Sequence, residues 1–353
     1  MVNRYGQGVR SGMRRMAIAV GLPLMTALLG TLAPNAEAQG QTVLKAAFYQ
    51  PAGHPIVELA KESLAKIEKA TEGRVKFAIY ASSTLVPTAE MASGVDDGTA
   101  FMAIWFMPYM SKTIPLFDIE TIPVWTAGTC KAIIDAYDAG LNDVYTEALK
   151  RQGLANVKVA GVSECLPRVL AARKEVRVPA DAKGLKVRSV GAEADMFKFI
   201  GASPVNMTMD QAYEALSRGI VDGITNGFMM LYERSHLEPL KHVTNMNLTS
   251  VLMHVIYNSA TLAKLDPRDR PTVEKGMKEV AEHVRAGLDK RNAETIASSG
   301  GKFGTRIYQP TEAERKEWIE AAQASRKAFE ARAANDPLIK KGLGYVYQFN
   351  PRD

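Results

Sequence analysis

Apolar residues along the chain recur at two different spacings, and these spacings predict strands that alternate with helices. Residues 42–48 are rich in strand-forming side chains, residues 50–53 carry a turn signal, and residues 57–70 place apolar side chains at helical spacing. Apolar and other positions alternate again over 74–80, and a second helix is expected from about Thr88. This order of elements predicts a layered α/β lobe.

The same alternation starts again after Gly153. It predicts further strands at 157–161, 168–173, 185–188 and 251–258, and helices at 192–200 and 209–218. Long amphipathic helices at 272–292 and 311–334 are expected to pack across or behind the lobes. We therefore expect two lobes, the first made of 42–163 with about 251–292 and the second of 164–250 with about 293–353.

The first 38 residues differ from the rest. Four arginines precede an apolar run from about Met16 to Leu32, and Ala36-Glu37-Ala38 follows, which together predict a secretory signal peptide at 1–38. The alternative is a retained membrane anchor, but Pro23 interrupts the run, which falls short of the roughly 20 apolar residues that cross a bilayer. We expect an exported, periplasmic protein.

Composition narrows the class of partner. The net charge of +6 includes a leader with four arginines and one glutamate, so the rest of the chain is near +3, too little to indicate nucleic-acid binding. No later segment is apolar enough to cross a membrane, so we expect no insertion of the mature chain. Cys130 and Cys165 could pair in an oxidising compartment or remain two buried thiols, and the sequence leaves both open.

Residues 179–226 hold the strongest candidate for a binding site. Arg188 ends the predicted strand at 185–188, where its guanidinium can project into a cleft and hold an anion through two charge-assisted hydrogen bonds. An isolated arginine is more often a solvated surface residue. The surrounding pattern decides between the two interpretations.

This segment resembles the signature of the periplasmic solute-binding proteins of TRAP (tripartite ATP-independent periplasmic) transporters, the DctP family. There it runs DLKGLKxR and then GAxPxPxxxxExYxALxxGxVDGxEN. The matching residues here are Asp181, Lys183, Gly184, Leu185, Lys186 and Arg188, followed by Gly201, Ala202, Pro204, Tyr213, Ala215, Leu216, Gly219, Val221, Asp222, Gly223 and Asn226. The resemblance extends over nearly all of the mature chain. It implies a two-lobe, type II-like periplasmic binding protein fold with a ligand cleft between the lobes and long C-terminal helices.

The resemblance also implies roles for particular residues. Arg188 matches the arginine that binds the ligand carboxylate, Arg168 matches a second arginine that often assists, and Asn226 matches an asparagine that lines the pocket. Asn226 could instead be a turn residue before Gly227. Two arginines on one pocket imply a ligand with at least one carboxylate.

Departures from the family pattern bear on the ligand's identity. Thr225 and Gly227 stand where the family often has Glu and Pro, and Met209, Asp210 and Gln211 where it often has an aromatic residue, Ser or Ala, and Glu. Met209 is expected in the pocket. Trp105 and Phe106 could form an apolar wall or simply belong to the core. Tyr49 is expected at the cleft edge, and His54 as a turn residue beside Pro55.

The histidines and cysteines show no metal spacing, and neither a nucleophile elbow nor a phosphate loop occurs. Glu193, Asp195 and Asp210 could hold a metal but are more simply solvated helix faces and caps, so we expect no metal and no cofactor. The leading hypothesis is a solute-binding protein that delivers a small organic anion to integral-membrane TRAP permease subunits. An exported enzyme acting on a carboxylate and a sensory ligand-binding module are the alternatives.

Overall fold

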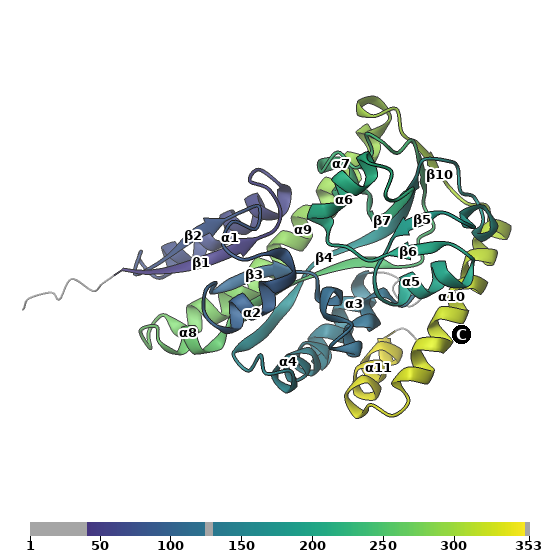
Figure 1. The fold of residues 1–353 in the computed structure, drawn as a ribbon. Coiled ribbons are helices and arrows are strands. Elements are labelled where there is room, and N and C mark those ends of the chain that lie inside the picture. Colours follow the sequence, from purple (N-terminus) through teal and green to yellow (C-terminus); the bar gives the residue numbers. More distant parts are fainter. Residues whose placement is uncertain (1–40, 124–129, 350–353) are drawn as a thin grey trace, which may run out of the picture. The chain divides into compact units, whose positions relative to one another are not determined.

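The computed structural model describes residues 41–123 and 130–349, apart from the side chains of 299–302. The predicted signal peptide at 1–38 lies outside these residues. The described part of the chain is a mixed α/β structure with two sets of hydrogen-bonded strands. Figure 1 shows that one set carries β1, β2 and β3, and the other β5, β6 and β7.

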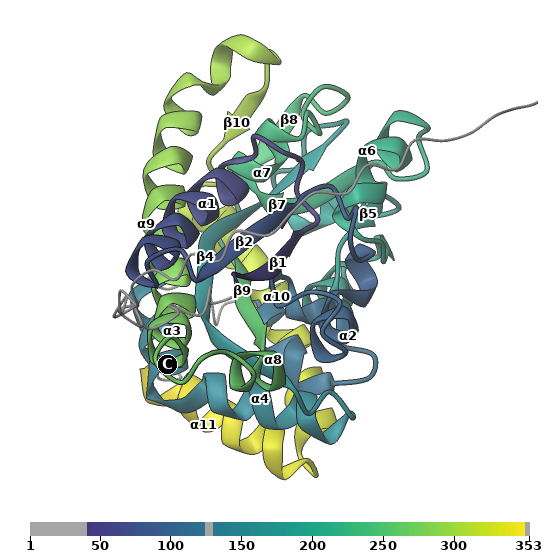
Figure 2. The ribbon, with the colours of Figure 1, turned by 90° about the vertical axis from the view of Figure 1, so that its left-hand side faces the viewer.

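The first sheet runs in the order β2-β1-β3-β9-β4. Strand β1 is parallel to β2 and β3, while β9 is antiparallel to β3 and β4. Its strands are β1 (Thr42–Phe48), β2 (Val75–Tyr80), β3 (Met102–Trp105), β9 (Ser250–Asn258) and the first part of β4 (Val157–Ala172). The helices of this part are α1 (Pro55–Ala70), α2 (Met91–Asp96), α4 (Asn142–Arg151), α8 (Ser259–Ala263) and α9 (Arg270–Lys302). Helices α1 and α9 pack side by side (Figures 1 and 2).

The second sheet continues from β4 through β7 and β5 to β6, and on the other side of β4 lie β8 and then β10. Its strands are β5 (Lys186–Arg188), β6 (Ser203–Val205), β7 (Gly223–Gly227), β8 (His242–Thr244) and β10 (Arg306–Tyr308). The helices of this part are α5 (Gly191–Phe199), α6 (Met209–Ser217), α7 (Phe228–Glu233) and α10 (Glu312–Ala333). Helix α10 packs on α5, as expected for a C-terminal helix behind a lobe.

Strand β4 belongs to both sheets. Its residues 157–167 pair with β9, and residues 168–172 then pair with β7 and β8. The sequence predicted two separate strands here, and that prediction was wrong. The interval between them contains Glu164 and Pro167, which break the apolar pattern without ending the strand, and the ladder absorbs irregularities between Val159 and Gly161 and between Val162 and Glu164. The expected lobe boundary at 163/164 falls inside this strand.

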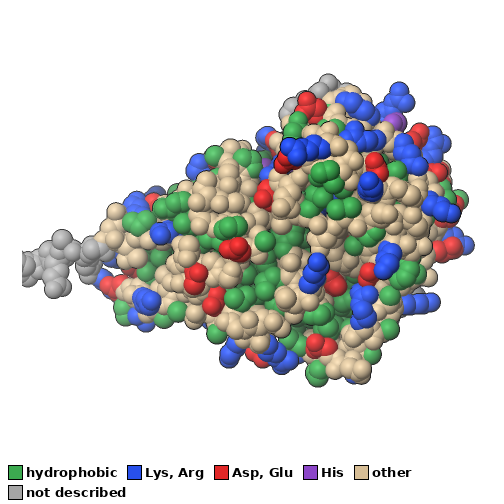
Figure 3. All heavy atoms as spheres, in the orientation of Figure 1, with side chains coloured by type: hydrophobic (Ala, Val, Ile, Leu, Met, Phe, Trp, Pro, Cys, Tyr) green, Lys and Arg blue, Asp and Glu red, His purple; other side chains and the backbone are tan. Residues whose placement is uncertain are grey.

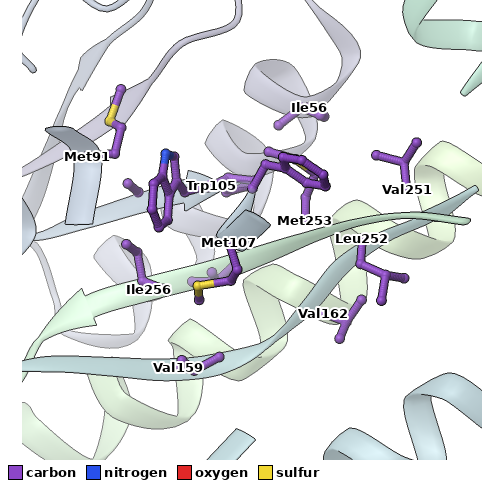
Figure 4. Close-up of a cluster of buried hydrophobic side chains, with 14 of the residues drawn as sticks. Ile56, Met91, Trp105, Met107, Val159, Val162, Val251, Leu252, Met253 and Ile256 are labelled. Carbon is purple, nitrogen blue, oxygen red and sulfur yellow. The ribbon is translucent and has the colours of Figure 1, made fainter. Parts of the chain in front are cut away.

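Two groups of buried side chains form the core. The larger surrounds the first sheet and its helices and continues into α6, β7, α7 and β8; Figure 4 shows part of it, with Trp105, Met107 and Ile256 close to β9. The smaller lies behind the second sheet and includes Phe197 of α5 and Trp318 of α10. The smaller group belongs to the second sheet alone, whereas the larger joins elements of both sheets.

A disulfide joins Cys130 at the start of α3 (Cys130–Ala136) to Cys165 of β4, with the two Cα atoms 5.8 Å apart. It answers the question that the sequence left open. The last helix, α11 (Pro337–Phe349), packs against α3. The disulfide thus links α3, against which α11 packs, to β4, the strand that both sheets share.

Candidate functional site

A small cavity lies between side chains from both sheets. Six of the residues that line it are those expected in the pocket or at its edge: Tyr49, Phe106, Arg168, Arg188, Met209 and Asn226. Tyr109, Val251 and Met253 complete the wall. The free volume is about 10 Å³, at most the space of one water molecule. These side chains therefore pack against one another and leave no room for an organic acid in this arrangement.

Arg188 is the last residue of β5, a strand enclosed between β6 and β7. Its side chain is only 1% exposed, and its Nε and Nη2 donate to the carbonyl of Met207 at 3.0 and 2.8 Å. Burial lowers the pKa of Arg188, and the nearby charge of Arg168 adds to that effect. The backbone thus orients one edge of the guanidinium and fixes its plane against the cavity.

Arg168 reaches the same cavity from β4. It is 1% exposed, and its Nη1 lies 3.3 Å from Oε2 of Glu193. Its Nε and Nη2 are buried without a hydrogen-bond partner in the described part of the chain. The guanidinium carbon lies 5.7 Å from the ring centroid of Phe106, within the range of a cation–π contact. Two donors on Arg168 are therefore left for an acceptor that enters the cavity.

Glu193 is part of this network, contrary to the sequence-based expectation of a solvated helix face. It is 1% exposed and accepts hydrogen bonds from Thr225 at 2.6 Å and Thr249 at 3.3 Å. Thr225 stands where the family often has Glu, and the carboxylate that pairs with Arg168 comes from Glu193 of α5. Asp195 pairs with Arg332, and Asp210 is exposed. Within residues 41–123 and 130–349, no three acidic, His or Cys side chains are grouped as metal ligands.

Asn226 and Met209 contact each other. The Nδ2 of Asn226 lies 2.9 Å from the sulfur of Met209, and its Oδ1 accepts from the backbone N–H of Gly227. The backbone N–H of Met209 donates to the Tyr109 hydroxyl at 3.1 Å. Tyr109 comes from the β3 side and Met209 from the start of α6, so this hydrogen bond bridges the two sides of the cavity.

Trp105 and Phe106 take different places although they are adjacent. Trp105 is fully buried and donates its indole N–H to the carbonyl of Thr88 at 2.8 Å, and it is not among the residues of the cavity wall (Figure 4). Phe106 lies in that wall, with its ring edge-on to Tyr109 at a centroid distance of 5.1 Å. The structure therefore brings Phe106, and not Trp105, to the arginine pair.

Glu164 is a buried ionisable group that the sequence reasoning missed. It is 0% exposed, and neither carboxylate oxygen has a hydrogen-bond partner among the residues that the structure describes. Burial raises its pKa to about 8, while Arg168 opposes the shift. The available signal was a carboxylate inside the otherwise apolar and small run from Val162 to Leu166.

A larger cavity of about 590 Å³ adjoins this site at Tyr109 and at Ser189, the residue after Arg188. Charged side chains line its outer part, and Asp195 and Arg332 pair there at 2.8 Å. On the face seen in Figure 3, hydrophobic side chains gather around the middle, while Lys and Arg side chains are spread more widely. This cavity is open to solvent, and Tyr109 lines both cavities.

The fold is that of the periplasmic solute-binding proteins of TRAP transporters. One such structure, from Sulfitobacter sp. NAS-14.1 with bound β-D-galacturonate, superposes with a TM-score of 0.77 at 16% identity over 88% of this chain and all of that one. The model of the family DctP, bacterial extracellular solute-binding protein family 7, matches residues 46–332. The chain therefore belongs to this family.

Other members of the family resemble the chain at similar levels. The extracytoplasmic solute receptor DctP7 of Bordetella pertussis, solved with pyroglutamic acid, superposes with a TM-score of 0.77 at 18% identity over 86% of this chain and 99% of that one. The C4-dicarboxylate-binding periplasmic protein DctP of Rhodobacter capsulatus is 26% identical over 265 residues, which are 72% of this chain and 76% of that protein. The named ligands of these relatives are all organic acids.

Proposed function

We propose that this protein is the periplasmic solute-binding component of a TRAP transporter, that it binds a small organic acid by its carboxylate, and that it delivers the acid to integral-membrane permease subunits. The observation that carries the proposal is the arginine pair. Arg168 and Arg188 are each 1% exposed on one cavity, and two N–H groups of Arg168 have no partner within the described residues. Desolvated guanidinium groups of this kind favour a carboxylate strongly.

Charge balance supports a single carboxylate at this end of the site. Arg168 and Arg188 contribute two positive charges, and Glu193 neutralises one of them through its 3.3 Å ion pair. Glu164 is protonated below a pKa of about 8. The cavity therefore carries a net charge near +1 at neutral pH, which one carboxylate balances.

Capture requires relative movement of the two sheets. Tyr49, Phe106 and Tyr109 approach the cavity from the first sheet, and Arg188 and Asn226 from the second. Opening would separate these groups and admit the acid, and closure would exclude water and strengthen the ion pairs.

Within residues 41–123 and 130–349, no helix combines the length and apolarity that a bilayer crossing demands.

The test is binding of organic acids to the purified protein. Its melting temperature should rise by a few degrees with the right acid, since a ligand at a hundred times its dissociation constant adds about 2.7 kcal/mol of stability. Arg188→Met should weaken calorimetric binding by about a hundredfold or more. Arg218→Met, at an exposed arginine that pairs with Glu214, is the matched control and should bind normally. Unchanged affinity in Arg188→Met would overturn the assignment.

A further inference from the structure

Basic side chains gather at the end of the second sheet that lies opposite the arginine cavity. Strands β5, β6 and β7 are parallel, and β4 is antiparallel to β7 and β8, so the starts of β5, β6, β7 and β8 meet the end of β4. The start of β10 joins them because β10 is parallel to β8. Arg188 is the last residue of β5 and lies at the other end. We call this surface the basic end; it consists of residues 173–174, 183–186, 198–203, 218–222, 241–242 and 304–306.

Backbone hydrogen bonds hold these segments side by side. The N–H of Asp222 donates to the carbonyl of Lys186 at 2.7 Å, and its carbonyl accepts from the N–H of Arg173 at 3.1 Å. The N–H of Gly184 donates to the carbonyl of Gly201 at 2.9 Å, and a similar bond joins the segments that begin β8 and β10. The six segments therefore form one continuous surface.

The basic end concentrates positive charge. Its only acidic residue is Asp222, whose carboxylate accepts from the backbone N–H of Lys186 at 2.8 Å. The chain without its predicted leader is near +3 overall, so the rest of it is net negative. Among the described residues, Arg218 alone of the basic side chains here has an ion pair, with Glu214. The exposed basic residues are Arg173, Lys174, Lys183, Lys186, Lys198, Arg218, Lys241 and Arg306.

Two large apolar side chains are exposed at the same end. Phe199 is 54% exposed and follows Lys198, and Ile220 is 50% exposed and lies two residues after Arg218. Exposed aromatic and aliphatic side chains among lysines are typical of surfaces that rest on anionic lipid, where the apolar groups enter the headgroup region. The two cavities described above involve none of these residues.

We infer that the basic end binds the surface of an anionic phospholipid bilayer. Lysine makes up most of its charge, and lysine is depleted in protein–protein interfaces, whereas it draws a protein surface to anionic lipid. Phe199 and Ile220 reach only the headgroup region, so the protein lies on the bilayer and does not cross it. Because the basic end faces away from Arg188, the protein can hold its acid while it is on the membrane.

The test is sedimentation of the purified protein with vesicles of phosphatidylcholine and with vesicles of phosphatidylcholine mixed with phosphatidylglycerol. Binding to the anionic vesicles should be at least about tenfold tighter than to the neutral ones. Most of it should disappear between about 0.1 and about 1 M salt, since the screening length falls from about 10 to about 3 Å. Equal binding to both vesicles, or binding to neither, overturns the inference. Acid binding is measured separately, so the proposed function would still stand.

A charge variant tests the location. It combines Lys174→Gln, Lys183→Gln, Lys186→Gln and Lys198→Gln, and it should bind anionic vesicles about a hundredfold less tightly while its affinity for the acid stays unchanged. The matched control changes four exposed lysines elsewhere that have no ion pair among the described residues: Lys66→Gln, Lys150→Gln, Lys264→Gln and Lys340→Gln. Equal losses in the two variants would show that total charge drives binding, which overturns the assignment to this end.

An apolar variant tests the contact with the headgroups. Phe199→Ser with Ile220→Ser should weaken vesicle binding by about tenfold. The control pair is Val43→Ser with Ile296→Ser, which are 55% and 45% exposed elsewhere on the chain and should bind normally. If the wild type ignores anionic vesicles but the four-lysine variant no longer supports acid uptake by cells, the basic end faces a protein partner and the inference is overturned.

Discussion

Arg168 of β4 and Glu193 of α5 form an ion pair in which both side chains are 1% exposed, with Nη1 and Oε2 3.3 Å apart. Glu193 also accepts hydrogen bonds from Thr225 and Thr249. The pair therefore holds the second arginine in place while halving the positive charge that the arginines bring to the cavity. Breaking a buried pair leaves the remaining charge uncompensated, which has measurable consequences for stability and for binding.

Glu193→Gln should lower the free energy of unfolding of the ligand-free protein by about 3–5 kcal/mol, because Arg168 stays buried without its counter-ion. A bound acid can replace that counter-ion, so the ligand-induced rise in melting temperature should be larger in the variant than in the wild type. Thermal and urea unfolding with and without ligand measure both quantities. In the double variant Glu193→Gln, Arg168→Met the losses should not add, and strict additivity would argue against coupling.

Glu164 should make stability fall with rising pH. Its carboxyl has a raised pKa in the folded protein, about 8 against an ordinary value of 4.5, so the folded state holds a proton that the unfolded state releases. This contribution to stability is fully present below pH 4.5 and is lost as pH rises through about 8. Urea unfolding between pH 5 and 9 should show a decline of a few kcal/mol that Glu164→Gln removes. A variant with the wild-type slope would contradict this, and the exposed Glu214→Gln serves as control.

Acid binding should also be linked to protonation of Glu164. A carboxylate placed at Arg168 competes with Glu164 for the same positive charge and therefore favours the protonated carboxyl. Calorimetry at pH 8 in two buffers of different ionisation enthalpy should reveal uptake of a fraction of a proton on binding, and affinity should fall towards pH 9. Glu164→Gln should abolish the uptake. Identical apparent enthalpies in both buffers for the wild type would disprove the linkage.

Substitution of Phe106 should affect mainly acid binding, and substitution of Trp105 mainly stability. Phe106→Leu removes the aromatic face near Arg168 and should weaken acid binding several-fold with a modest loss of stability. Trp105→Phe removes the hydrogen bond to Thr88 and core volume, and should cost about 1–3 kcal/mol of stability with little effect on affinity. A loss of affinity in Trp105→Phe equal to that in Phe106→Leu would place both rings at the ligand.

The disulfide should stabilise the protein by restricting the unfolded chain. It closes a loop between residues 35 positions apart, for which the chain-entropy relation gives about 4 kcal/mol. Urea unfolding with and without a reductant should show a loss of this size. The double variant Cys130→Ser, Cys165→Ser should unfold like the reduced protein and be insensitive to reductant. A wild type equally insensitive to reductant would argue against the bond in solution.

Local periodicity predicted the elements that have a single buried face. The expected strand at 42–48 and the helix at 311–334 agree with β1 and α10 almost residue for residue, and Thr311 and Glu314 form a capping box at the start of α10. Strand β4 was divided in the prediction because Glu164 and Pro167 break the apolar pattern. Their environment is provided by β9, almost ninety residues further along the chain, and local sequence does not show it.

For the site, the sequence predicted those residues to which the resemblance to the family assigned a role one by one. Arg168, Arg188 and Asn226 do lie on one cavity. Neighbouring residues at the end of a strand take opposite directions, so the pattern could not decide between Trp105 and Phe106. The burial of Glu193 depends on Arg168, 25 residues earlier in the chain.

The continuity of β4 through both sheets has a mechanical consequence. Each half of the strand is held by its own ladder of hydrogen bonds, so a rotation of one sheet relative to the other must appear as twist in the few peptide units near residue 167, where the pairing changes from β9 to β7 and β8. Arg168 is the first residue past that pivot and should move least. We expect Arg168 to stay in place and contact the acid early. Tyr49 and Arg188 lie farther from residue 167, so they should move over longer distances and contact the acid last.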